Sequence, residues 1–114
     1  MPRDDASYLL DMLLAAHDAV YFATGLTYAE FEQSRLHQNA ILKSIEIIGE
    51  AAARISTETK QTHPEIPWPY IIGMRNRLVH DYFEVNLKSV WDTVQGDLPR
   101  LIILIEPLVP PEVD

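Results

Sequence analysis

"AILKSIEIIGEAAARI", residues 40–55, carries the clearest helical pattern in the chain. Its apolar side chains recur every three or four residues, as they do along one face of an amphipathic helix: Ala40, Ile41, Ile45, Ile48, Ala52 and Ile55. Gly49 and the alanines at 51–53 add little bulk, so that a second helix can approach closely. The stretch predicts a long helix with other helices packed against it.

The segment before this helix has the same period. Its apolar residues fall three or four apart, on one face of a first helix: Leu9, Met12, Leu13, Ala16, Val20 and Ala23. Gly25 is expected to end that helix, because glycine favours the position after a helix C-terminus. Thr27 and Glu30 have the spacing of a capping box, which predicts that the next helical region begins there, with a short turn before the long helix.

After a polar end near residues 56–62, the sequence "HPEIPWPYIIGM" (63–74) places three prolines before a new apolar run. Proline suits the first turn of a helix and is costly inside one. A third helix is therefore predicted from about Pro67 to about His80. Trp68 and Tyr70 near its start are interpreted as core anchors rather than as platforms for stacked bases.

Asn86 is expected to cap a fourth helix, which Pro99 should kink or split. From about residue 107 the chain is rich in proline and acidic residues and reads as an exposed end. There is no internal repeat and no alternating pattern long enough for a sheet. The prediction is one all-α domain over residues 1–114, an up-down bundle of about four to five helices.

Composition narrows the class of protein. The chain has 114 residues, too few for two independent cores, and 47% of them are hydrophobic, so disorder is not expected. It contains no cysteine, which excludes a disulfide scaffold, a thiolate zinc site and a cysteine nucleophile. No apolar run approaches the roughly 20 residues that span a membrane. We expect a soluble, cytoplasmic protein.

The chain is acidic, with nine Lys and Arg against 17 Asp and Glu and a formal net charge of -8. Proteins that coat nucleic acids normally present a net basic face, because neutralising phosphates drives their affinity. Any nucleic-acid contact here must therefore be local and built from a few arginines. A long duplex DNA partner is not expected, whereas a basic partner protein would suit the charge.

The residues with the most chemistry form "RNRLVHDY", residues 75–82. Arg75 presents a permanently charged planar fork that matches phosphate oxygens. His80 titrates near neutral pH and can accept or donate a proton. Asn76 could orient His80 or bind an oxygen, and Tyr82 could donate a hydrogen bond or stack on a base. Together these groups suit attack of an RNA 2′-hydroxyl on its own phosphodiester without a metal.

The spacing raises a difficulty and leaves an ordinary alternative open. On a regular helix Asn76 and His80 share a face, whereas Arg75 and His80 lie about 140° apart. One helix needs a frayed end, long side chains or a second subunit to aim both at one atom. Alternatively, the histidine only contacts the last carbonyls of its helix and the arginine only pairs with an acid.

Other titratable groups are interpreted as structural. Glu46 and Glu50 lie one helical turn apart and are expected to pair with arginines such as Arg54 or Arg75 rather than to bind a metal. The remaining histidines show no metal-ligand spacing and are treated as ordinary: His17, His37 and His63. The sequence also lacks a phosphate-cradling glycine loop and a zinc signature.

The pattern Arg, four residues, His, any residue, Tyr resembles the signature of the HEPN superfamily. The surrounding stretches resemble its HepT-like branch: "IEIIGEAA" (45–52), "HPEIPWPYIIGMRNRLVHDYF" (63–83), "VW" (90–91) and "DLP" (97–99). The likeness runs from about residue 28 to 99 and is strongest over the twenty residues that end at Phe83.

The resemblance implies a helical homodimer in which two motifs face each other across a cleft, so that residues of both chains are pooled. It also implies a metal-independent endoribonuclease that acts as a toxin and needs no cofactor. Arg75 and His80 match the catalytic pair, and Asn76 matches the polar residue after the arginine. The partner implied is a minimal nucleotidyltransferase antitoxin, which neutralises the toxin by attaching AMP to the motif tyrosine, here Tyr82.

Two alternatives stand beside the ribonuclease. The first is a non-catalytic dimeric module that holds the nucleotidyltransferase and presents Tyr82. The net charge of -8 motivates it, because this charge disfavours RNA binding. In a further alternative, the chain is a nucleotide-binding regulator that uses Arg75 as its phosphate ligand.

Overall fold

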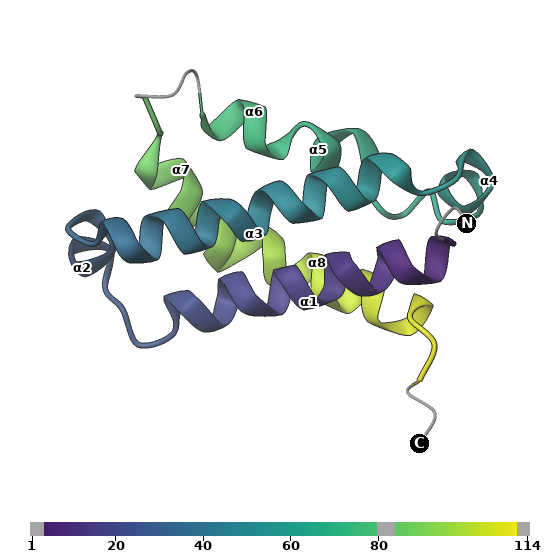
Figure 1. Cartoon of the computed structure of the whole chain (residues 1–114), viewed down its shortest axis with the longest axis horizontal. Coiled ribbons are helices and arrows are strands. Elements are labelled where there is room, and N and C mark those ends of the chain that lie inside the picture. Colours follow the sequence, from purple (N-terminus) through teal and green to yellow (C-terminus); the bar gives the residue numbers. More distant parts are fainter. Residues whose placement is uncertain (1–3, 80–83, 112–114) are drawn as a thin grey trace.

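A computed structural model describes residues 4–79 and 84–111 (Figure 1), and it confirms that the chain is all-α. The two longest helices are α1 (Asp5–Ala23) and α3 (Arg35–Arg54). The other helical segments follow in chain order: α2 (Tyr28–Glu32), α4 (Thr57–Thr62), α5 (Trp68–Ile72), α6 (Met74–Leu78), α7 (Leu87–Asp92), the π-helical turn η1 (Thr93–Asp97), α8 (Leu98–Ile105) and the 3₁₀ turn η2 (Glu106–Leu108). Among the described residues none of these helices is long and apolar enough to cross a membrane.

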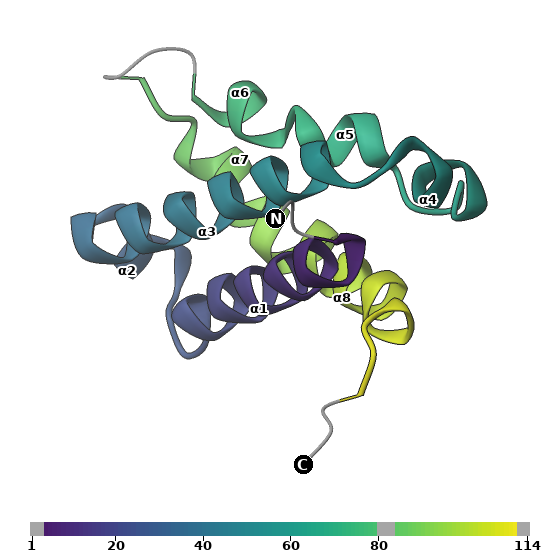
Figure 2. The same ribbon diagram turned by 45° about the vertical axis from the view of Figure 1, so that its right-hand side comes forward.

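Helix α3 lies in the middle of the bundle. Helix α1 packs antiparallel along one side of it, and α5 and α6 cover another side (Figures 1 and 2). The α7–η1–α8 segment crosses behind α3 and returns to α1. The bundle is thus built from four parts: α1, α3, the broken α5–α6 helix and the α7–η1–α8 segment. This agrees with the prediction of about four to five helices.

The core forms where these elements meet, and the predicted apolar face of α3 supplies its centre. Five residues of that face are buried: Ile41, Ile45, Ile48, Ala52 and Ile55. Phe31 of α2 and Met12 of α1 are fully buried against the same core. Burying one such large side chain contributes about 1.5–3 kcal/mol to folding, so the α3 face sets the positions of the other helices.

The predicted ends of several helices are confirmed. Gly25 has φ +82°, a left-handed conformation that glycine adopts without a steric penalty. Thr27 Oγ1 accepts from the Glu30 amide at 3.1 Å and Glu30 Oε1 accepts from the Thr27 amide at 2.9 Å, which completes the capping box. Asn86 Oδ1 accepts from the Ser89 amide at 3.0 Å and so begins α7.

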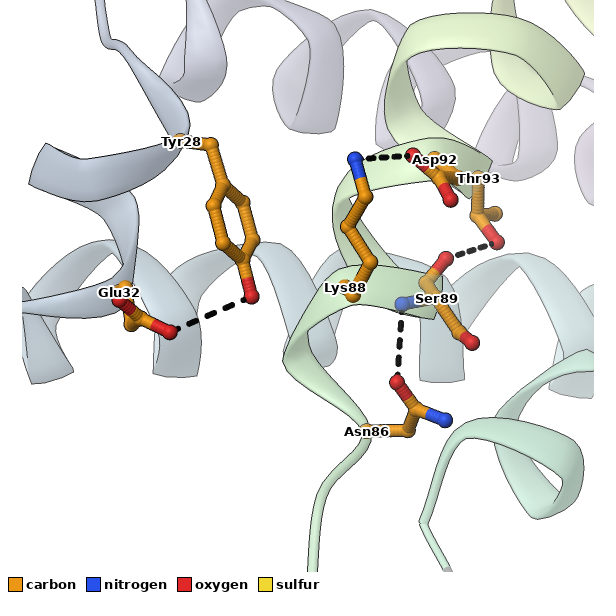
Figure 3. A network of polar contacts seen from close by, with 7 residues as sticks. All are labelled: Tyr28, Glu32, Asn86, Lys88, Ser89, Asp92 and Thr93. Atoms are coloured by element: carbon orange, nitrogen blue, oxygen red, sulfur yellow. Dashed lines mark hydrogen bonds and ion pairs between the residues drawn. The ribbon is translucent and has the colours of Figure 1, made fainter.

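Polar side chains of α7 lie beside Tyr28 and Glu32 of α2 (Figure 3). Lys88 Nζ lies 3.1 Å from Asp92 Oδ1 and 5.2 Å from the centre of the Tyr28 ring. Thr93 Oγ1 donates to the Ser89 carbonyl at 2.8 Å. Helix α7, the first helix after the "RNRLVHDY" stretch, therefore lies beside α2, at the opposite end of the bundle from α4.

The single helix predicted from about Pro67 to about His80 is wrong in two respects. It is divided at Gly73 into α5 and α6, and it ends at Leu78. Val79 is extended (φ -125°, ψ 108°) and forms an isolated antiparallel bridge with Val85. The Asn86 amide also donates to the Leu78 carbonyl at 2.9 Å. The helix stops because these backbone groups pair with a returning segment.

Pro99 splits the last long helix, as predicted. Immediately before it, the backbone makes the π-helical turn η1, in which the Leu98 amide donates to the Thr93 carbonyl five residues earlier. Proline has no amide hydrogen and its ring collides with the carbonyl four residues before it in a regular helix. The wider turn shifts the hydrogen-bond register at this point, and α8 then starts with proline in its first turn.

Candidate active site

Helix α6 presents its polar residues to solvent and its apolar residues to the core. Met74 and Leu78 are buried, whereas Arg75 and Asn76 are exposed. Residues 74 and 78 lie one turn apart and anchor one face, so the rotation of α6 is fixed by packing. The sequence-predicted Arg75 and Asn76 are therefore available to a ligand, and the Arg75 guanidinium lies 3.5 Å from Asn76 Oδ1.

Arg75 lies where two hollows meet between α3 and the α5–α6 helices. The first hollow, of about 440 Å³, is lined by Glu46, Gly49, Glu50, Ala53, Ile72, Arg75 and Asn76. The second, of about 310 Å³, is lined by Asn39, Leu42, Lys43, Glu46, Arg75, Val79 and Val85. Arg75 and Glu46 line both hollows. We call this continuous depression the α3–α6 groove.

Gly49 allows α5 to sit close to α3 beside this groove. A Cβ built at Gly49 would lie 3.4 Å from the carbonyl oxygens of both Ile71 and Ile72. This confirms the prediction that the small residues of α3 permit a close helix approach. The resulting contact places the end of α5, and hence the start of α6, directly against the middle of α3.

The charges in the groove are arranged differently from the prediction. Glu46 pairs with Lys43 at 3.9 Å, one turn away on α3, and not with Arg54 or Arg75. Within the described part of the chain, no carboxylate lies within ion-pair distance of Arg75. Glu46 and Glu50 line the groove beside Arg75 but make no ion pair with it. Among the described residues, the contact of the Arg75 guanidinium that remains is the one with Asn76 Oδ1 at 3.5 Å.

His80 and Tyr82, the other predicted site residues, lie outside the described residues. What the structure does fix is the chain on either side of them. Helix α6 ends at Leu78, and the expected one-turn relation of Asn76 to His80 and the 140° separation of His80 from Arg75 fall outside the described residues. Val79 and Val85 both line the groove, so the described chain leaves and returns at its edge.

The remaining predicted residues are only partly as expected. Trp68 is buried and its Nε1 donates to the His63 carbonyl at 3.1 Å, which confirms a core anchor. Tyr70 is not a core residue, because it is 43% exposed and its hydroxyl donates to Asp97 Oδ2 at 2.6 Å. His37 contacts Ser34 Oγ at 2.6 Å, an ordinary contact at the start of α3.

Two residues of the groove, Asn39 and Lys43, were missed from the sequence. Along α3, Asn39, Lys43, Glu46 and Glu50 follow one another at intervals of four, three and four residues, so the four polar side chains form one stripe on the helix. That stripe was the available signal, because it faces the helix that carries Arg75. Among the described residues, no three acidic or histidine side chains converge as a metal site requires.

A comparison with models of known protein families identifies the family of the chain. The family model described as Ribonuclease HepT-like matches residues 12–108, nearly the whole chain. The chain belongs to the HepT-like family. The α3–α6 groove and all four predicted site residues fall inside the matched range.

Individual HepT-like relatives cover most of the chain as well. "Probable ribonuclease HepT" of Thermococcus cleftensis is 37% identical over 101 residues, which are 89% of this chain and 92% of the relative. "Putative RNase MJ1380" of Methanocaldococcus jannaschii is 33% identical over 99 residues, 87% of this chain and 91% of the relative. No solved structure matches this HepT-like chain.

Proposed function

We propose that this HepT-like protein is a metal-independent endoribonuclease, the toxin of a two-gene toxin–antitoxin module. The observation that carries the proposal is the position of Arg75. It is exposed at the junction of the two hollows, and the described residues offer it no carboxylate partner. A guanidinium in this setting suits a phosphodiester, and relatives of similar length are named as ribonucleases.

In the proposed reaction the 2′-hydroxyl of RNA attacks the adjacent phosphorus and the 5′-oxygen leaves. Arg75 binds the phosphate oxygens and stabilises the added negative charge of the transition state. His80 takes the proton of the 2′-hydroxyl or returns one to the leaving oxygen. Asn76 holds the Arg75 side chain or an oxygen of the phosphate, in keeping with its 3.5 Å distance from the guanidinium.

RNA cleavage by purified protein in EDTA tests this assignment. We expect Arg75→Ala and His80→Ala to lower kcat by about 10²–10³, the usual effect of removing a group that stabilises the transition-state charge. Arg100→Ala is the matched control, because Arg100 is an exposed arginine on α8 that does not line the groove. Full activity of folded His80→Ala would remove histidine from the mechanism.

The second part of the proposal is a homodimer that pools residues of two chains at one cleft. Mixed dimers test it. If one site uses Arg75 of one subunit and His80 of the other, a dimer of an Arg75→Ala chain with a His80→Ala chain retains one intact site. Its activity would approach half that of the wild type. If each site lies within one subunit, the mixed dimer is inactive.

Control by AMP transfer to Tyr82 from a nucleotidyltransferase antitoxin completes the proposal. Mass spectrometry after co-expression with the antitoxin would locate the added AMP, and Tyr82→Phe should be neither modified nor neutralised. A stable, unmodified complex with the antitoxin would instead indicate neutralisation by sequestration.

One observation favours the alternative of a non-catalytic dimeric module that holds the nucleotidyltransferase. The chain has a net charge of -8, and Glu46 and Glu50 line the groove beside Arg75. These carboxylates repel a polyanion and suit a basic protein surface. Wild-type protein that leaves total RNA, tRNA and mRNA intact while binding the partner would establish this alternative.

A further inference from the structure

The Arg77 side chain turns back from α6 over α5, away from the groove. Its guanidinium carbon lies 3.8 Å from the centre of the Tyr70 ring. Its Nη2 also donates a hydrogen bond to the Tyr70 backbone carbonyl. That carbonyl lies in the last turn of α5, where helix carbonyls lack partners within the helix. Arg77 therefore joins α6 to the end of α5 by both stacking and hydrogen bonding.

Tyr70 extends this connection to η1. Its hydroxyl donates to Asp97 Oδ2 at 2.6 Å, and Asp97 is the last residue of the π-helical turn η1. This hydrogen bond, together with burial and the charge of Asp97, raises the pKa of Tyr70 above its usual value. Because the ordinary pKa of tyrosine already lies well above neutral pH, the hydroxyl is a donor there with or without this shift. We call the three residues the Arg77–Tyr70–Asp97 strut.

Gly73 leaves room for the strut. It stands at the joint between α5 and α6, and a Cβ built there would lie 3.0 Å from Arg77 Nη1. Real Cβ atoms rarely approach other atoms so closely, so any side chain at residue 73 would displace the guanidinium. Gly73 therefore both separates α5 from α6 and leaves the space that the Arg77 side chain occupies.

Helix α6 needs such support. It has five residues and no side-chain cap at its start, and a helix this short has little stability of its own. Arg75 and Arg77 are two residues apart, or about 200° around the helix. Arg77 consequently points away from the groove and does not line either of its hollows.

We propose that the Arg77–Tyr70–Asp97 strut positions α6 for catalysis, by fixing the direction of Arg75 and of Val79, where the described chain leaves α6. Arg77 is a positioning residue and not a catalytic one. The inference rests on the proposed ribonuclease function for its kinetic consequence, but its structural consequence is independent of that function.

Cleavage kinetics of three variants test the strut. Arg77→Ala removes both contacts with Tyr70, Tyr70→Phe removes only the hydroxyl that reaches Asp97, and Arg100→Ala is an exposed arginine control near the same residues. A misplacement of about 1 Å can lower a rate about 100-fold. We expect kcat to fall roughly 10–100-fold in Arg77→Ala and less in Tyr70→Phe, with KM changed less than about threefold.

Rescue separates positioning from simple stability. Arg77→Lys keeps the charge but not the planar fork, so it should regain only part of the activity at equal melting temperature. Wild-type kcat in folded Arg77→Ala and Tyr70→Phe would overturn the inference and leave the ribonuclease proposal intact. A fall in kcat that matches only the fraction of unfolded protein would also overturn it.

Amide hydrogen exchange provides the readout that needs no RNA. The Val79 amide donates to the Arg75 carbonyl at 3.0 Å, and the Asn86 amide donates to the Leu78 carbonyl. Both amides should exchange faster in Arg77→Ala and Tyr70→Phe than in wild type or Arg100→Ala. Unchanged exchange contradicts the strut. Faster exchange in a protein whose wild type cleaves no RNA supports the strut and removes the ribonuclease proposal instead.

Discussion

Replacing Gly49 by valine tests the contact that seats α5 and α6 on α3. An alanine Cβ at this position would lie 3.4 Å from two carbonyl oxygens, which is at the tight end of ordinary contact. Alanine also gains about 1 kcal/mol of helix propensity over glycine. We therefore expect Gly49→Ala to change the free energy of unfolding little, because the two effects oppose each other.

Valine adds two methyl groups to that Cβ. In a helix its χ1 is largely restricted to one rotamer, so the methyl groups cannot swing freely away from the carbonyls of Ile71 and Ile72. Overpacking of this kind costs about 1–3 kcal/mol, and valine recovers only about 0.4 kcal/mol of propensity over glycine. The net expectation is a loss of about 1–2 kcal/mol, or roughly 4–8 °C in Tm.

Urea denaturation followed by far-UV circular dichroism measures the change. Gly96→Val is the control, because no atom lies within 4 Å of a Cβ built at that exposed glycine. Its free energy of unfolding should stay within about 0.5 kcal/mol of the wild-type value. If Gly49→Val is as stable as Gly96→Val, the close approach of α5 to α3 does not hold the bundle in the way described.

Three further results are expected. Asp5 accepts hydrogen bonds from the Ser56 amide, the Ser56 hydroxyl and the Thr59 hydroxyl at 3.0, 2.5 and 2.5 Å, and the hydroxyl bonds are the main cause of its lowered pKa. Asp5→Asn should lower the free energy of unfolding by about 1 kcal/mol at pH 7. Because the pKa of Asp5 is lower in the folded state than its ordinary value of 3.8, the ionised carboxylate stabilises the fold at pH values above 3.8. This stabilisation is lost as the pH falls through the folded-state pKa. In acid titrations of stability below about pH 4, the wild type should therefore lose its advantage over Asp5→Asn. Lys43→Ala should reduce the slope of log affinity for single-stranded RNA against log salt by about 0.7, as one lost phosphate contact would, and fluorescence anisotropy at several KCl concentrations would show no change in slope if Lys43 does not meet RNA. Gly25→Ala should lower stability by about 1–2 kcal/mol in thermal melts because φ is +82° there, and an unchanged Tm would argue against the left-handed turn.

Local patterns in the sequence predicted most of the fold. The apolar stripe of α3, the capping box at Thr27 and the cap at Asn86 each depend on residues within one or two turns. Such signals survive because the packing of α3 and the hydrogen bonds of the caps agree with the local preferences. The split before Pro99 follows from the chemistry of proline alone.

The parts that were predicted wrongly depend on contacts that helical periodicity does not encode. Tyr70 reads as a core aromatic in the sequence, but its hydroxyl reaches Asp97, 27 residues later. Helix α6 ends at Leu78 because Val79 pairs with Val85. Neither pairing has a signal in the local pattern, so the sequence extended one helix through Gly73 and onward to His80.

Part of the lining of the candidate groove was predictable from the sequence, and part was not. The motif singled out Arg75 and Asn76, and the structure exposes both on the groove. Lys43 could be recognised as a groove residue only from the structure, which shows that α6 lies beside the polar stripe of α3. Glu46 pairs with this lysine one turn away, whereas the sequence predicted an arginine partner.

The central claim is that Arg75 in the α3–α6 groove stabilises the charge of a cleaving phosphodiester. The most direct measurement is the single-turnover rate of RNA cleavage in EDTA by wild type, Arg75→Lys, Arg75→Ala and Arg100→Ala. The account predicts cleavage by wild type and Arg100→Ala, a partial loss in Arg75→Lys and a loss of about 10²–10³ in Arg75→Ala, with all four proteins folded. Equal cleavage by Arg75→Ala and wild type, or none by wild type, would contradict it.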